Sequence, residues 1–226
     1  MRIFIFVLLS LALGACSGEA SRAKKADTQA IFVLIENGGT VAPEDQKEAR
    51  LTINNLLHQL SKMDRRKATR GVQIHVVLTA LPNRVSWSGT PVQLLEQAAQ
   101  IQELITFKPT YSDLVIAFEQ IETTRNLTSP DKTHLYWVGP TIHVPFQDTG
   151  GEIEINVPQE LPEGLALAAL APHLSTLKIL RVHADQDQVL QAYLATLGVF
   201  KRAGDGSLDF GLLGVAQTRS NLSDLL

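Results

Sequence analysis

Few side chains of this 226-residue chain have both the type and the spacing that catalysis or metal binding requires. No two histidines have the i, i+4 spacing that places two metal ligands on one face of a helix. Neither a phosphate-binding Gly-x-x-x-x-Gly-Lys loop nor a dinucleotide-binding Gly-x-Gly-x-x-Gly turn occurs, and segment 86–89, Ser-Trp-Ser-Gly, lacks the first glycine of a nucleophile elbow. The motifs therefore favour a binding role over an enzymatic one. The dispersed histidines are His58, His75, His134, His143, His173 and His183.

Cys16 is the single cysteine, and it closes an apolar run that follows Arg2. The run has the length of a signal-peptide core and is too short to span a bilayer. Its end, Leu-Gly-Ala-Cys, resembles the lipobox of bacterial lipoproteins, in which the cysteine is lipidated and becomes the first mature residue. The resemblance implies that 1–15 is a signal peptide and that Cys16 carries acyl chains such as palmitate; Ser17 favours the outer membrane. The alternative is an ordinary signal peptide cleaved nearby, with Cys16 incidental.

The composition after the signal peptide fits one exported α/β domain. We expect a flexible polar tether at 16–29, a single domain at 30–216 and a C-terminal tail at 217–226. Hydrophobic residues make up 45% of the chain, which is enough for a core without disulfides. The net charge of −3 argues against a nucleic-acid partner, because such proteins carry a concentrated basic face. The densest basic cluster, at 62–70, is either a solvated helix end or a docking patch for anionic lipid or an acidic partner.

Strands and helices alternate along the predicted domain. This order predicts a three-layer, Rossmann-like fold with a mostly parallel central sheet and helices on both faces. We expect strands at 30–35, 72–81, 135–138, 177–182 and 208–215, a short edge strand at 85–87 and a hairpin over 141–157 that turns at 148–151. Five helices are expected. The first follows Pro43, and the second follows Thr90 and buries Leu94, Leu95, Ala98, Ile101 and Ile105. The third begins after its cap Ser112, the fourth lies near 163–171, and the fifth begins at its cap Asp185 and stops at Gly198.

This order of elements resembles a von Willebrand factor type A domain. The family's Asp-x-Ser-x-Ser motif after the first strand would correspond to Glu36-Asn37-Gly38-Gly39-Thr40, and its Thr-Asp-Leu-x-x-Ala-Leu motif to the segment 112–118, which begins with Ser112. The family's third motif should fall at 139–141, where this chain has no carboxylate. Without the resemblance, 36–40 reads as a strand-to-helix turn whose glycines supply positive φ.

The resemblance implies a ligand site at the carboxyl ends of the strands, which is also where open α/β sheets bind ligands. The expected binding residues are Glu36, Thr40, Ser112 and Thr141. Members of the family bind a divalent cation there, and Glu36, Thr40 and Ser112 would be its ligands in this chain. Three oxygen ligands fall short of what Mg²⁺ requires, so we expect no resident cofactor.

Together these features predict a lipid-anchored, non-enzymatic protein-binding subunit of a bacterial envelope assembly, such as a secretion or conjugation machine. Its membrane contact would be the lipid at Cys16, in the outer membrane facing the periplasm. The alternative is a periplasmic enzyme, or a protein that binds a small ligand or ion in the strand-end cleft, with His75 or His143 beside Glu36. A deep pocket lined by those side chains would favour the alternative, and a shallow surface would favour a protein partner.

Overall fold

The computed structural model describes residues 27–63, 71–145 and 155–226. Several predicted features lie outside these residues: the expected signal peptide, Cys16, most of the expected tether, most of the basic cluster and the turn expected at 148–151. Within them, no helix is long and apolar enough to cross a membrane.

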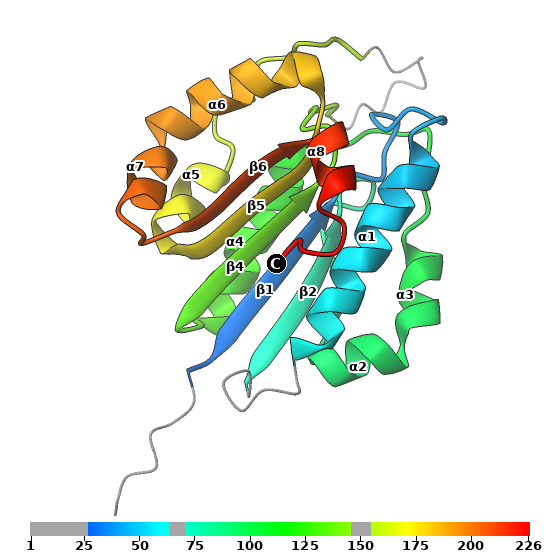
Figure 1. Cartoon of the computed structure of the whole chain (residues 1–226), viewed down its shortest axis with the longest axis vertical. Coiled ribbons are helices and arrows are strands. Elements are labelled where there is room, and N and C mark those ends of the chain that lie inside the picture. Colours follow the sequence, from blue (N-terminus) through cyan, green and yellow to red (C-terminus); the bar gives the residue numbers. More distant parts are fainter. Residues whose placement is uncertain (1–26, 64–70, 146–154) are drawn as a thin grey trace, which may run out of the picture.

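A six-stranded sheet forms the centre of the domain, in the order β3-β2-β1-β4-β5-β6 (Figure 1). All neighbouring strands are parallel except β3, which pairs antiparallel with β2 at one edge. The predicted mostly parallel sheet and its short edge strand are therefore confirmed. The strands are β1 (Gln29–Ile35), β2 (Val72–Leu78), β3 (Val85–Gly89), β4 (Lys132–Val138), β5 (Leu174–Val182) and β6 (Asp209–Gly214).

Helices cover both faces of the sheet, which gives the predicted three layers. On one face, Phe32 and Leu34 belong to a core cluster that also contains residues of α4, α5, α6 and α7. On the other, Ile31 and Val33 pack against α1, α2 and α3; in Figure 1, α1 lies in front of the sheet and α4 behind it. The α-helices are α1 (Gln46–Ser61), α2 (Pro91–Glu96), α3 (Ala98–Leu104), α4 (Leu114–Thr128), α5 (Leu167–Leu170), α6 (Asp187–Thr196), α7 (Val199–Gly204) and α8 (Val215–Ser220).

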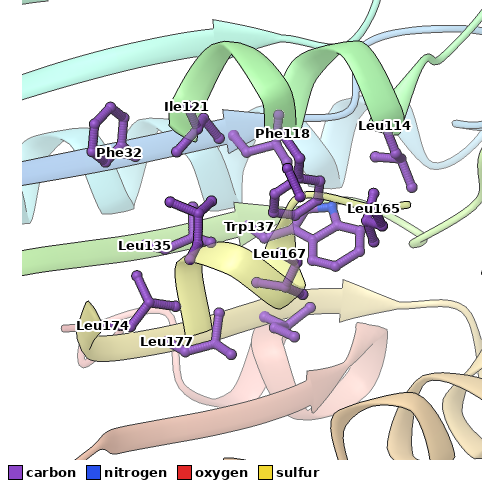
Figure 2. Close-up of a cluster of buried hydrophobic side chains, with 14 of the residues drawn as sticks. Phe32, Leu114, Phe118, Ile121, Leu135, Trp137, Leu165, Leu167, Leu174 and Leu177 are labelled. Atoms are coloured by element: carbon purple, nitrogen blue, oxygen red, sulfur yellow. The ribbon is translucent and has the colours of Figure 1, made fainter. Parts of the chain in front are cut away.

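Trp137 is the largest fully buried side chain in the core on the α4 face. Figure 2 shows it beneath α4, where Phe118 meets it edge to face with 5.1 Å between the ring centroids. Such aromatic pairs stabilise a core beyond the area they bury. A buried indole N–H needs a hydrogen-bond acceptor, and Glu36, directly after β1, provides one for Trp137.

Two helix starts differ from the sequence prediction. Asp113, not Ser112, caps α4: its side chain accepts a hydrogen bond from the amide of Ile116. Ser112 is extended instead, because its backbone forms an isolated bridge with Val144. Asp185 lies inside a 3₁₀ turn, Ala184–Gln186, that precedes α6. The stop at Gly198 is confirmed, since this glycine follows α6 with a φ of 69°.

Other differences concern element lengths. The helix expected after Thr90 is two short helices, α2 and α3, so Leu95 points outward and is exposed. In the described parts of 141–157 the only pairing is the bridge at Val144, so these residues do not form the expected hairpin strands. The expected tail at 217–226 belongs to the packed domain, because it contains part of α8 and the buried Leu225.

Candidate functional site

The carboxyl ends of β1, β4 and β5 meet at a cleft of about 330 Å³. Ligand sites in open α/β sheets are found at this end of the strands. Most of its lining is aliphatic, and the charged and titratable side chains that line it are Glu36, Glu44, Asp45, Arg181 and His183. The aliphatic lining includes Val41, Ala42, Ile53, Val138, Pro140, Ile142, Ile155, Val157 and Val215.

Glu36 follows β1 directly and turns into the protein, with only 1% of its surface exposed. Its Oε1 accepts hydrogen bonds from the indole of Trp137 (2.7 Å) and the amide of Thr141 (2.8 Å). Its Oε2 receives longer bonds from the amide of Ile142 (3.3 Å) and the hydroxyl of Thr40 (3.5 Å). One carboxyl group thus joins the end of β1 to the end of β4 and to the loop that follows it.

Burial raises the pKa of the Glu36 carboxyl to about 8, against the opposing effect of the hydrogen bonds it accepts. The two short bonds both end on Oε1, and Oε2 accepts the longer ones.

Gly139 allows this close approach. A Cβ at that position would lie 2.4 Å from the Cβ of Glu36, a distance that real side chains essentially never show. Thr141, two residues on, has a positive φ of 65°, a strained value for a β-branched residue. The loop after β4 is thus shaped to present the Thr141 and Ile142 amides to the carboxyl group.

Ser112 lies apart from this carboxyl group. Its hydroxyl donates to the hydroxyl of Thr79 (2.7 Å), which also accepts a hydrogen bond from the amide of Asn37 (3.3 Å). Ser112 does not line the cleft. Of the four residues expected at the site, the structure brings Glu36, Thr40 and Thr141 together and places Ser112 in a separate buried network.

The donor set does not fit a divalent cation. The groups that surround Glu36 are N–H and O–H donors, whereas Mg²⁺ and Ca²⁺ require several oxygen acceptors. Ser112 is engaged elsewhere, and the described ranges contain no group of three or more His, Cys, Asp or Glu side chains able to hold a metal. The cation implied by the family resemblance therefore has no suitable ligand set among these residues.

This geometry predicts that Mg²⁺, Mn²⁺ and Ca²⁺ will leave the melting temperature of the protein unchanged, measured by thermal unfolding against a chelator control. An ion bound to the native state would raise the melting temperature by mass action. A saturable rise that disappears in Ser112→Ala would show that the cation binds after all.

Arg181 lines the cleft, and the sequence interpretation did not identify it. It interrupts the apolar end of β5, and the pairing of β5 with β6 shifts register at this residue. Its φ of 66° is in the left-handed region, and the hydroxyl of Thr218 in α8 accepts a hydrogen bond from its amide (2.9 Å). A bulge of this kind redirects a side chain, here into the lining of the cleft. The one available signal was an arginine at the apolar end of this strand.

The histidines proposed for the alternative function lie elsewhere. His75 Nδ1 is 2.8 Å from the hydroxyl of Ser88 at the β2–β3 edge, and His143 Nδ1 accepts the amide N–H of Leu114 (3.1 Å) at the start of α4. Burial lowers the pKa of both imidazoles. Neither lines the cleft; the histidine that does is His183.

No protein-family model and no curated protein matches the chain. Among solved structures, it is similar to three N-terminal domains of the type V pili tip protein Mfa5 from Porphyromonas gingivalis (11% identity, TM-score 0.41) and to the vWF domain of that protein (10%, 0.37). It is also similar to the PilB minor pilin from Streptococcus sanguinis (8%, 0.42).

These matches cover 65%, 65% and 90% of this chain, and 26%, 51% and 63% of the matched chains, respectively. The chain thus spans less than two thirds of each matched structure. At these identities and TM-scores, no activity or partner transfers from those proteins to this chain.

Proposed function

We propose that this chain is a non-enzymatic, protein-binding subunit of a bacterial envelope assembly, and that the strand-end cleft holds a segment of its partner. The observation that carries this proposal is the cleft itself, which is open, largely aliphatic and bordered by charged side chains. Interfaces combine an apolar centre with a polar rim in the same way.

The state of Glu36 supports a binding role over catalysis. A general base must reach a substrate proton with a free lone pair. Four protein hydrogen-bond donors surround the Glu36 carboxyl group. His75 and His143, which an enzymatic function would place beside Glu36, lie outside the cleft. The carboxyl group therefore acts in the architecture of the cleft.

The location in the envelope is the second part of the proposal. It rests on the apolar run and the Leu-Gly-Ala-Cys ending at Cys16, which lie outside the described residues. Two or three acyl chains would hold the domain permanently at a membrane, since each buried methylene contributes about 0.8 kcal/mol. We propose that this membrane is the outer membrane, with the domain in the periplasm as part of a secretion or conjugation machine.

A photo-crosslinking amino acid at Ile155, which lines the cleft and is 39% exposed, tests the proposal in intact cells. The matched control position is Leu127, which is 82% exposed at the far end of α4. We expect a discrete protein adduct from Ile155 and none from Leu127. A palmitate analogue should label the same chain and fail to label its Cys16→Ser form.

No adduct from Ile155, or the same adducts from both positions, would contradict the protein-binding function. Label retained by Cys16→Ser would contradict the lipid anchor alone.

One observation favours a second candidate, a small-ligand-binding protein. The volume of about 330 Å³ falls at the lower end of the range for small-molecule pockets, about 300–1,000 Å³. Binding of an acidic peptide compared with binding of a free aliphatic acid separates the two candidates.

A further inference from the structure

The guanidinium of Arg181 is buried, and its ion pairs are long. Its side chain is 5% exposed, and its carboxylate partners among the described residues are Glu48, with an N···O distance of 3.7 Å, and Asp45, at 4.0 Å. A guanidinium has five N–H donors, and two long ion pairs do not use them all. The cleft that Arg181 lines is where a missing acceptor would bind.

The backbone holds Arg181 in this place. The register shift in β5, the positive φ and the hydrogen bond to Thr218 all act on this one residue. A strained backbone persists only where the surrounding structure enforces it, and such positions cluster at binding sites. The conformation thus supports a role for the Arg181 side chain in binding.

The two carboxylates near Arg181 do not engage its guanidinium fully. Glu48 is shared, because Arg219 in α8 binds its Oε1 directly. Asp45 is half exposed and too far away for a hydrogen bond, so it can be displaced towards solvent. With two arginines and two carboxylates, the cluster is close to neutral. A singly charged ligand group fits it better than a doubly charged phosphate, which would be repelled by Asp45 and by Glu44.

We propose that Arg181 binds the carboxylate of a ligand whose aliphatic portion occupies the cleft. Arginine pairs with carboxylates through two parallel N–H···O bonds, which suits a planar guanidinium whose present ion pairs are long. This proposal rests on the proposed function: the carboxylate belongs to an acidic side chain of the partner protein, and aliphatic residues flank that side chain. A free aliphatic acid offers the same chemistry and is separated from it by experiment.

Two matched pairs of probes test the proposal on the full chain in detergent, by NMR titration. The first pair is N-acetyl-Leu-Glu-Leu-amide and its Gln counterpart. The second is 4-methylpentanoate and 4-methylpentanamide. We expect the Glu peptide to bind at least tenfold more tightly than the Gln peptide. This preference should be lost in Arg181→Gln, weakened in Arg181→Lys and kept in Arg219→Gln, which removes the exposed arginine of the same cluster.

Each outcome is decisive. If neither acid binds more tightly than its amide, the assignment of Arg181 is overturned, while cross-linking from Ile155 still decides the proposed function. If only 4-methylpentanoate binds through Arg181, the carboxylate site stands and the protein partner is replaced by a small ligand. If the Glu peptide binds Arg181→Gln as it binds the wild type, Arg181 does not recognise the carboxylate. The comparison of each acid with its amide uses the wild-type chain, so it stays informative even if a variant unfolds.

Discussion

Glu36→Ala is expected to lower the free energy of unfolding by about 3–5 kcal/mol, measured by urea denaturation at pH 6. The change removes the acceptor of the Trp137 indole and of the Thr141 and Ile142 amides, all in the interior. Each buried donor left without a partner costs about 1–3 kcal/mol. The empty space between β1 and β4 adds to the loss.

Glu44→Ala is the matched control, because Glu44 borders the same cleft but is exposed to solvent. Its stability should stay within about 0.5 kcal/mol of the wild type. Glu36→Gln keeps one acceptor oxygen and should lose less than Glu36→Ala. Equal stability of Glu36→Ala and Glu44→Ala would show that the carboxyl group does not hold the strand ends together.

The second large effect is on pH dependence. Burial raises the pKa of Glu36 to about 8 in the folded state, above the ordinary value of 4.5 for a glutamate carboxyl, so between these values the folded state binds the proton more tightly. The stability from this proton is fully present below pH 4.5 and is lost as the pH rises towards 8. Relative to Glu36→Gln, which cannot titrate, the wild type should lose up to about 1.4 kcal/mol per pH unit across this window.

The wild type is compared with Glu36→Gln because histidine side chains also change their protonation within this pH range. Burial lowers the pKa values of His75, His134 and His143, so their contribution is present above their unfolded pKa and is lost as the pH falls. This trend is opposite to that of Glu36 and is shared by both proteins. Parallel stability curves for the wild type and Glu36→Gln from pH 5 to pH 8 would refute a raised pKa at Glu36.

The sheet was predictable because its signals are local. The uninterrupted apolar run of β1 indicated a strand covered on both faces, and every residue from Ala30 to Ile35 is buried. The alternation with helices indicated parallel pairing. The caps were harder to predict, because Ser112 and Asp113 are adjacent and both can cap a helix. The choice between them depends on Thr79, in a different element, which bonds the Ser112 hydroxyl.

The position of the candidate cleft at the strand ends was predictable, but the orientation of its side chains was not. Its placement at strand ends follows from the topology, which correctly put Glu36 and Thr141 together. The inward turn of Glu36 depends on Trp137, which is 101 residues away and gives no local signal. Arg181 was missed because the bulge that redirects its side chain is a property of the pairing between β5 and β6.

The attachment of α8 to the cleft has a consequence for the order of folding. Thr218 accepts the hydrogen bond from the Arg181 amide, and Arg219 binds Glu48 across a separation of 171 residues. Contacts between residues so far apart in the sequence require a long loop to close first, which makes them slow to form. The cleft is therefore complete only after α8 has docked against the first half of the domain.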